Sequence, residues 1–258
     1  MTEFTMIKYE MAGHVAVITL NRPERLNAIL YPMIKEFVVA MDRAVEEGAR
    51  ALVVTGAGRA FSAGGDLIGR DDIHDTGKPL EDFWNAFAEK LICLPIPVVT
   101  AINGVAAGAA VSIGLSADFI IMEESSYFQL AFLKVGLHPD GGAVWLLSRL
   151  VSRQRATEIL MLSEKLSARK AEEWGMIYKV VEDGTSLATA MELAGRLAKG
   201  PTKAYALLRR TLVETYDGTL TSSLHLERLA QQIAGASSDF QEGLDAFRER
   251  REPKFIGR

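Results

Sequence analysis

Two short runs of small residues are the part of this sequence best suited to do chemistry. One spans residues 60–66, Ala-Phe-Ser-Ala-Gly-Gly-Asp, and the other spans residues 103–109, Asn-Gly-Val-Ala-Ala-Gly-Ala. Each follows an apolar, strand-like run, at residues 51–55 and 97–102. A turn from such a strand into a helix leaves backbone N–H groups without partners in the chain. Two such turns side by side would form an oxyanion hole, in which N–H donors stabilise negative charge developing on one oxygen.

Asp140 is an acidic residue whose role the sequence around it leaves open. It lies within residues 138–142, His-Pro-Asp-Gly-Gly, directly before an apolar helical pattern. Two interpretations are open from the residues alone: an aspartate here is a good helix N-cap, and its carboxylate can also act as a general base. His138 could orient it. Ser112 lacks the Gly-x-Ser-x-Gly setting of a nucleophile elbow, so we expect a small helix residue there.

The elements that must position these residues alternate along the first half of the chain. Short β-branched runs predict strands, and apolar residues three and four apart predict helices. The expected strands are at residues 14–20, 51–55, 97–102 and 118–122, and the expected helices are at residues 31–47 and 81–94. From Gly141 to Arg250 the pattern predicts amphipathic helices broken at Gly175, Gly184, 200–201 and Gly218, the last at residues 241–251.

Composition excludes several classes of protein. The 258 residues are 48% hydrophobic, which is ample for a packed core, and the net charge of −4 gives no basic surface for nucleic acid or an anionic membrane. Cys93 is the only cysteine, so no disulfide or multi-cysteine metal site is expected. The sequence contains no apolar run long enough for a membrane span, and no signal or transit peptide is visible. We therefore expect a soluble, cytoplasmic protein.

The motifs together resemble the crotonase (enoyl-CoA hydratase/isomerase) superfamily. The resemblance rests on residues 61–67 and 103–118, with further similarity at residues 21–28 and 170–181. It implies an α/β fold, a crotonase-like spiral of repeated strand-strand-helix units. The acyl-CoA site would lie in residues 1–200, and residues 201–258 would form a C-terminal helical trimerisation region. The implied assembly is a homotrimer or a dimer of trimers.

The same resemblance implies a role for each site residue. The N–H groups of Gly65 and Ala109 would hold the thioester oxygen of an acyl-CoA substrate. The CoA portion would lie along the following residues: Arg25, Leu26, Ala28, Ala63, Gly64, Gly65, Asp66 and Leu67. Asp66 is also expected to cap a helix that begins at Leu67. Phe247 and Arg250 match positions that help to bind CoA, here for a neighbouring subunit. CoA is part of the substrate, so no separate cofactor and no metal are expected.

Two departures from the family pattern point to a particular reaction. Hydratases of the family use two glutamates to orient water, and this chain has Ser112 and Phe132 in their places. Residues 139–147, which contain Asp140, resemble enoyl-CoA isomerases of the phenylacetate-degradation type, in which this aspartate moves the proton. An isomerase is therefore expected. A one-carboxylate hydratase, a dehalogenase-like enzyme and a non-catalytic acyl-CoA-binding subunit stay open as alternatives, as does the acyl group, which we expect residues 69–79 to select.

Overall fold

The computed structural model describes residues 4–67 and 75–258, which form a mixed α/β fold with two sheets. The larger sheet has six strands in the order β1-β2-β3-β5-β7-β10, of which β1 is antiparallel to β2 and the others are parallel. Their bounds are β1 (Ile7–Ala12), β2 (Val15–Leu20), β3 (Ala51–Gly56), β5 (Val98–Ile102), β7 (Phe119–Glu123) and β10 (Lys179–Val181). All of the strands expected from the sequence are present in this sheet.

A second, four-stranded sheet holds the short strands that follow the long ones. Its order is β4 (Ala60–Ser62), β6 (Val105–Ala107), β8 (Tyr127–Gln129) and β9 (Leu166–Ser167). In the pairs β3–β4, β5–β6 and β7–β8, the first strand lies in the large sheet and the second in the small sheet, and helical segments follow each pair. The chain therefore winds as repeated strand-strand-helix units. Strands β4, β6 and β8 run parallel, which places the ends of β4 and β6 next to each other.

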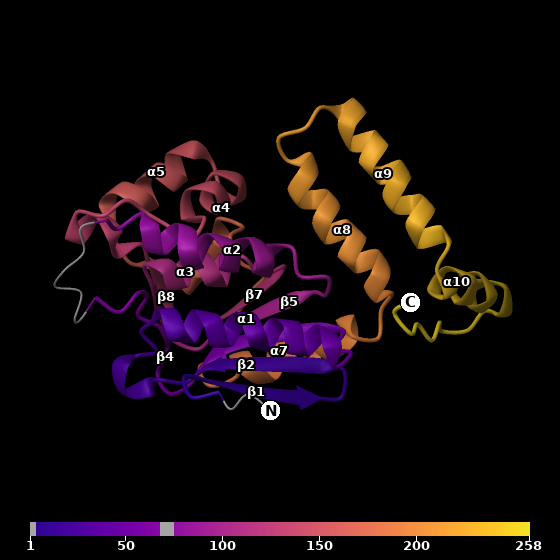
Figure 1. Cartoon of the computed structure of the whole chain (residues 1–258), viewed down its shortest axis with the longest axis horizontal. Helices are drawn as coiled ribbons and strands as arrows, with labels where there is room; N and C mark the ends of the chain where they lie inside the picture. The colour runs from indigo at the N-terminus through magenta and orange to yellow at the C-terminus, as the bar shows by residue number, and fades with distance from the viewer. Residues whose placement is uncertain (1–3, 68–74) are drawn as a thin grey trace.

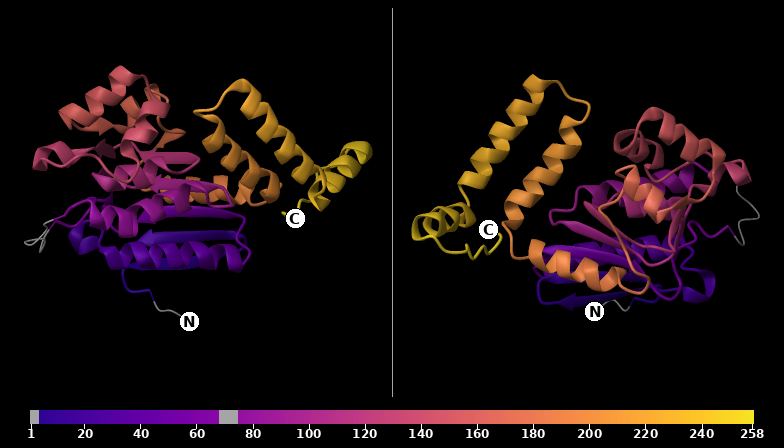
Figure 2. Two further views of the ribbon diagram at one scale, coloured as in Figure 1. Left: turned by 45° about the horizontal axis from the view of Figure 1, so that its top comes forward. Right: turned by 180° about the vertical axis from the view of Figure 1, so that it is seen from behind.

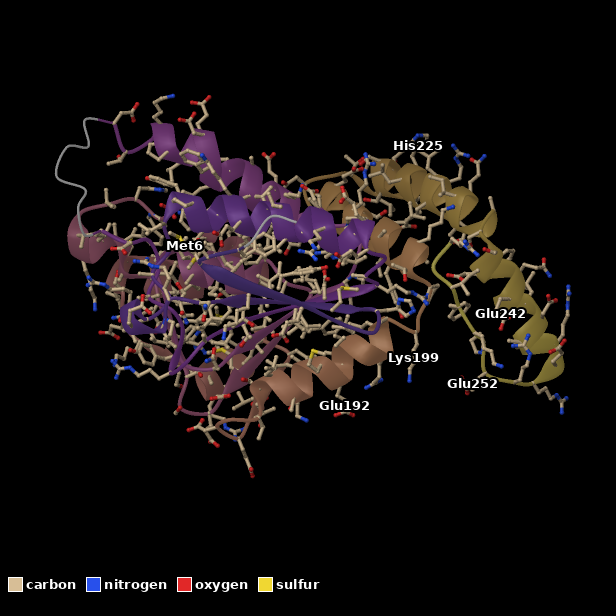
Figure 3. The ribbon with its side chains drawn as sticks, turned by 60° about the horizontal axis from the view of Figure 1, so that its bottom comes forward. Met6, Glu192, Lys199, His225, Glu242 and Glu252 are labelled. Carbon is tan, nitrogen blue, oxygen red and sulfur yellow. The ribbon has the colours of Figure 1, made fainter. Side chains whose placement is uncertain are left out.

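Helices cover both faces of the large sheet, which explains why its central strands are apolar throughout. Every residue of β3 and of β5 is buried, as expected for parallel strands with both faces covered. Helix α1 (Tyr31–Glu46) packs on one face through residues such as Phe37 and Met41, and α7 (Ser186–Leu197) packs on the other through Ala190 and Ala194. Figure 3 shows strands of this sheet between α1 and α7, the helix that carries the labelled Glu192.

The remaining helical segments lie mostly in the second half of the chain. Their bounds are η1 (Pro23–Arg25), η2 (Leu80–Trp84), α2 (Asn85–Ile92), α3 (Ala109–Leu115), η3 (Ala131–Val135), α4 (Ala143–Leu150), α5 (Arg153–Leu162), α6 (Ala168–Glu173), α8 (Thr202–Thr215), α9 (Leu220–Gly235) and α10 (Ser238–Glu249). The expected breaks separate these helices. Helix dominates after Gly141, as the sequence pattern predicted, and the short strands β9 and β10 also lie there.

Helices α8, α9 and α10 form an arm that leaves the body of the molecule. Helices α8 and α9 are an antiparallel hairpin, and α10 follows at the end of the hairpin where α8 begins, next to the C-terminus (Figure 1, Figure 2). In Figure 3, Glu242 of α10 and the nearby Glu252 lie at one end of the molecule, beyond Lys199 at the end of α7. No residue of α9 is buried, and the arm contacts the body through α8 and the loop after it, where Arg149 of α4 forms an ion pair with Asp217 at 2.6 Å.

Buried polar contacts hold α8 in place on the body. The Arg209 guanidinium of α8 forms an ion pair with Asp118, with Nε 2.7 Å from Oδ2, and donates to the carbonyl oxygens of Leu91 and Leu94. Arg50 donates from Nε to Thr202 Oγ1 at 2.9 Å. The direction in which α8 leaves the body is therefore fixed by hydrogen bonds within one chain.

Candidate active site

The two small-residue loops predicted to form the oxyanion hole lie against each other. Each follows one strand of the parallel pair β4–β6. A Cβ built on Gly64, whose φ is +88°, would lie 2.5 Å from Ala107 O and 3.4 Å from Gly108 Cα. The backbones touch at a distance that only glycine allows at position 64. The small residues at this point are therefore required by the contact between the loops.

The Gly65 N–H points away from the strand beside it. Gly65 pairs with Ile29 in an isolated parallel bridge, in which Ile29 N–H donates to Gly64 O at 2.7 Å and Asp66 N–H donates to Ile29 O at 2.9 Å. Successive N–H groups of an extended chain alternate in direction. The N–H of Gly65 therefore faces the side opposite Ile29, and Gly65 lines a cavity of about 490 Å³.

The second donor comes from the start of α3. Ala109 is the first residue of this helix, after Gly108 with φ +52°, and it lines the same cavity as Gly65. The first N–H groups of a helix have no partner within the helix, and they carry the positive end of its dipole. The structure therefore places the two predicted donor residues, Gly65 and Ala109, at one cavity.

A buried asparagine, Asn27, fixes the first loop, and sequence reasoning missed its role. Its side-chain amide donates to Ala57 O at 2.9 Å and Ala60 O at 2.8 Å, so it ties the turn between β3 and β4. Ser62 Oγ donates to Asn27 O at 2.8 Å and accepts from Gly64 N–H at 3.1 Å. Asn27 has a left-handed φ of +55°, a conformation that asparagine tolerates better than most residues. The signal in the sequence that could have indicated this role is its position within the motif at residues 21–28.

Asp66 forms an ion pair with Arg22, with Arg22 Nη1 3.0 Å from Asp66 Oδ2. The same guanidinium donates to Ala28 O, so it links the segment before α1 to the oxyanion loop. The helix that we expected Asp66 to cap, from Leu67 onward, lies largely outside the described residues, as does most of the segment expected to select the acyl group. Thr76, from the described part of that segment, lines the cavity.

Asp140 lies on the loop between η3 and α4 and reaches the same cavity. It is not the N-cap of the following helix, because α4 begins at Ala143 and its N-cap is Gly142. The backbone carbonyl of Asp140 accepts a hydrogen bond from Ser112 Oγ at 2.9 Å. The structure therefore excludes the N-cap role for Asp140, and its role as a general base stays a prediction.

The cavity has a volume of about 490 Å³, which is the size of a small-molecule site. Phe132 and Trp84 are buried in its wall, and Tyr31 stacks on Phe83 at 4.8 Å between ring centroids. His138 also lines the cavity, and its Nδ1 lies 2.7 Å from Pro139 O. A carbonyl oxygen only accepts, so Nδ1 carries the proton in the neutral ring.

The residues predicted to bind CoA divide into two groups. Ala63, Gly65 and Leu67 line the cavity, and Gly64 lies in the same loop. Arg25, Leu26 and Ala28 lie in the segment before α1, which Arg22 and Asn27 join to that loop. Phe247 and Arg250 lie on and next to α10, at the far end of the arm from the cavity (Figure 1). The side chain of Phe247 is 84% exposed. A single chain therefore does not bring these two residues to the site.

The chain is similar to known proteins over its whole length. A family model described as enoyl-CoA hydratase/isomerase matches residues 10–258. The chain belongs to the enoyl-CoA hydratase/isomerase family. It is 41% identical to the 1,2-epoxyphenylacetyl-CoA isomerase of Escherichia coli, with 100% of both chains covered. It is 38% identical to a protein of Rhodobacter capsulatus named probable enoyl-CoA hydratase, with 98% of both covered.

Solved structures of the family share the fold. The crystal structure of an enoyl-CoA hydratase from Polaromonas sp. JS666 matches with a TM-score of 0.91 and 31% identity, and the match covers 96% of this chain and 99% of that chain. The mixed α/β architecture expected from the motifs is thus confirmed, and the chain is an enzyme of the enoyl-CoA hydratase/isomerase family. Both isomerases and hydratases occur among its relatives.

The described part of the chain shows neither a metal-binding cluster nor a spanning helix. Within residues 4–67 and 75–258, no three His, Cys, Asp or Glu side chains are grouped so that they could hold a metal ion. In the same residues, no helix is long and apolar enough to cross a membrane. That the reaction needs no cofactor besides the CoA of the substrate stays a prediction.

Proposed function

We propose that this protein is an enoyl-CoA isomerase that moves a carbon–carbon double bond along the acyl chain. The Asp140 carboxylate removes a proton from the carbon next to the thioester, and the electrons move onto the thioester oxygen to give a dienolate. The N–H groups of Gly65 and Ala109 stabilise that oxygen. The carboxylic acid then returns the proton two carbons further along, which gives the conjugated isomer. The atoms balance without water or a redox partner.

The observation that supports this proposal best is the set of residues that line the cavity. Among the described residues this set combines one carboxyl-bearing residue, Asp140, with the two loops that supply the N–H donors, whereas hydratases of the family use two glutamates to orient water. The positions of the hydratase glutamates hold Phe132, which cannot accept a proton, and Ser112, whose hydroxyl is used by a backbone carbonyl. One carboxylate suffices to move a proton between two carbons, so isomerisation fits these residues best.

A ring-bearing acyl group is the substrate class that we propose to test first. The name of the Escherichia coli relative, 1,2-epoxyphenylacetyl-CoA isomerase, describes such a substrate. In this chain the aromatic side chains of Tyr31, Trp84 and Phe132 line the cavity, and aromatic walls pack well against a flat ring. A panel of straight-chain, branched and aromatic CoA esters would rank these classes by kcat/KM.

The arm supports a proposal that the enzyme assembles as a trimer. Several large apolar side chains of α8 and α9 are between 46% and 76% exposed, namely Leu208, Leu212, Leu220, Leu224 and Ile233. Such a surface marks a protein interface. In the assembly, α10 would bring Phe247 and Arg250 to the CoA of a neighbouring subunit. Light scattering on the purified protein gives the mass of the assembly, and a monomer would contradict the proposal.

The Asp140→Asn variant tests the proposed reaction. The amide has nearly the shape of the carboxyl group but cannot take the proton, so we expect kcat for a β,γ-unsaturated enoyl-CoA to fall by about a thousandfold or more. Binding of a saturated acyl-CoA, measured by calorimetry, should be unchanged. Asp183→Asn is the matched control, because Asp183 is exposed and accepts from Ser125 N–H. Turnover near the wild-type value in Asp140→Asn would remove Asp140 as the base.

A further inference from the structure

Ser112 lies where a hydratase of this family has a glutamate, and its hydroxyl has an unusual partner. A serine within a helix often donates to the carbonyl four residues earlier. Ser116, the C-cap residue of α3, does so, because its Oγ donates to Ser112 O at 2.7 Å. Ser112 Oγ donates instead to Asp140 O at 2.9 Å, across 28 residues of sequence. This long-range hydrogen bond joins α3 to the loop that carries the proposed base.

The loop rests directly on this serine. Gly141 has φ +60°, and a Cβ built on it would lie 3.1 Å from Ser112 Cβ and 4.0 Å from the Trp84 ring. The side chain of Ser112 is itself 2% exposed. The Asp140 loop and helix α3 are therefore in direct contact at Gly141 and Ser112.

The same helix also carries one donor of the oxyanion hole. Ala109 is the first residue of α3, and Ser112 follows three residues later, on the same side of the helix. One rigid helical turn thus fixes the Ala109 N–H, which holds the thioester oxygen, and the carbonyl of the residue that moves the proton. The distance between the Ala109 N–H and the Asp140 backbone decides whether the Asp140 carboxyl group reaches the carbons of an acyl chain whose thioester oxygen is held at Ala109.

We propose that Ser112 is a positioning residue that sets the place of the Asp140 carboxyl relative to the Ala109 N–H. The proposal rests on the function proposed above. Serine at this position replaces a hydratase glutamate, and its hydroxyl also hydrogen-bonds to the loop that carries Asp140, whose carboxyl group is the only one assigned to the reaction. A misplacement of about 1 Å of a catalytic group lowers the rate by about a hundredfold.

The Ser112→Ala variant removes the hydroxyl and keeps the helix. We expect kcat for a β,γ-unsaturated enoyl-CoA to fall by about ten- to a hundredfold, with KM changed by less than about twofold because the substrate-binding groups are intact. Ser116→Ala is the matched control, since Ser116 is the buried C-cap residue of α3 and its hydroxyl donates to Ser112 O, within four residues of sequence. It should lose a similar amount of thermal stability and keep its kcat.

A second pair of variants separates the hydroxyl from the shape of the side chain. Ser112→Thr and Ser112→Val add the same volume, but only threonine retains the donor. We expect kcat of the threonine variant to exceed that of the valine variant by about tenfold. In the Asp140→Asn background, Ser112→Ala should cause no further loss, because a positioning residue acts only through the group that it positions.

These variants test the positioning role of Ser112 and the proposed isomerase function separately. Equal kcat in Ser112→Ala and Ser116→Ala, or in the threonine and valine variants, would overturn the positioning role while leaving the isomerase proposal in place. Full activity of Asp140→Asn would overturn the proposed function itself. A further loss from Ser112→Ala in the Asp140→Asn background would show that Ser112 acts by another route.

Discussion

Substitution of Gly64 by alanine tests whether the contact between the two loops creates the oxyanion hole. An alanine Cβ at this position would lie 2.5 Å from Ala107 O, whereas ordinary contacts begin near 3.4 Å. The loops must therefore separate by about 0.9 Å, the difference between these two distances. Alanine must also adopt φ +88°, which costs about 1–2 kcal/mol in the free energy of unfolding.

The separation acts on catalysis more than on folding. Gly65 follows the substituted residue, and Ala109 lies two residues beyond Ala107, so a shift of about 0.9 Å moves one donor away from the other. Loss of one oxyanion donor lowers kcat by about a hundred- to a thousandfold. We therefore expect Gly64→Ala to lower kcat for enoyl-CoA isomerisation by about a hundredfold or more.

Gly48→Ala provides the matched control. Gly48 has φ +80°, similar to that of Gly64, but nothing lies within 4 Å of its Cβ position. Both variants carry the backbone strain, and only Gly64→Ala forces the loops apart. Isomerase kinetics and thermal unfolding should show a similar loss of stability in both and a loss of kcat in Gly64→Ala alone. Wild-type kcat in Gly64→Ala would refute the role given to the loop contact.

Three further predictions concern the framework of the site. Asn27→Ala leaves buried carbonyls of the β3–β4 turn without their donor, and urea denaturation should show a loss of about 2–4 kcal/mol. Arg209→Met leaves Asp118 without its buried partner, and the same measurement should show a loss of about 3 kcal/mol. Burial alone would raise the pKa of the Glu36 carboxyl, but hydrogen bonds from the Thr5 hydroxyl and the N–H groups of residues 5–7 lower its pKa below 4.5. Because its pKa is lower in the folded state, the Glu36 carboxylate stabilises the fold above pH 4.5, and this stabilisation is lost as the pH falls through the folded-state pKa. Wild type and Glu36→Gln should therefore converge in stability in acid.

The sequence predicted the elements that are long or strongly patterned. Apolar residues three and four apart indicated a helix at residues 31–47, and α1 spans Tyr31–Glu46. Buried parallel strands are apolar throughout, so β3 and β5 were also recognisable. Strands β4, β6 and β8 have three residues each, and a run that short carries no periodicity. Their pairing, which brings the two loops together, therefore required the structure.

The candidate site was predictable to the extent that its chemistry lies in local motifs. The small-residue loops predicted an oxyanion hole because turns of this kind expose N–H groups, and the family resemblance assigned the donors to Gly65 and Ala109. The hydrogen bonds that hold the site cross long stretches of sequence, from Ser112 to Asp140 and from Asn27 to the β3–β4 turn. No local pattern marks such a pair. Phe247 is far from the cavity in a single chain, so its predicted role depends on an assembly.

Product analysis in water enriched in oxygen-18 tests the assignment of the reaction most directly. Hydration adds a solvent oxygen to the acyl chain, whereas proton transfer through Asp140 adds none. With a β,γ-unsaturated enoyl-CoA, mass spectrometry should show the conjugated isomer with the mass of the substrate and without oxygen-18, and this conversion should be lost in Asp140→Asn. A product that is heavier by one labelled water would contradict the isomerase assignment.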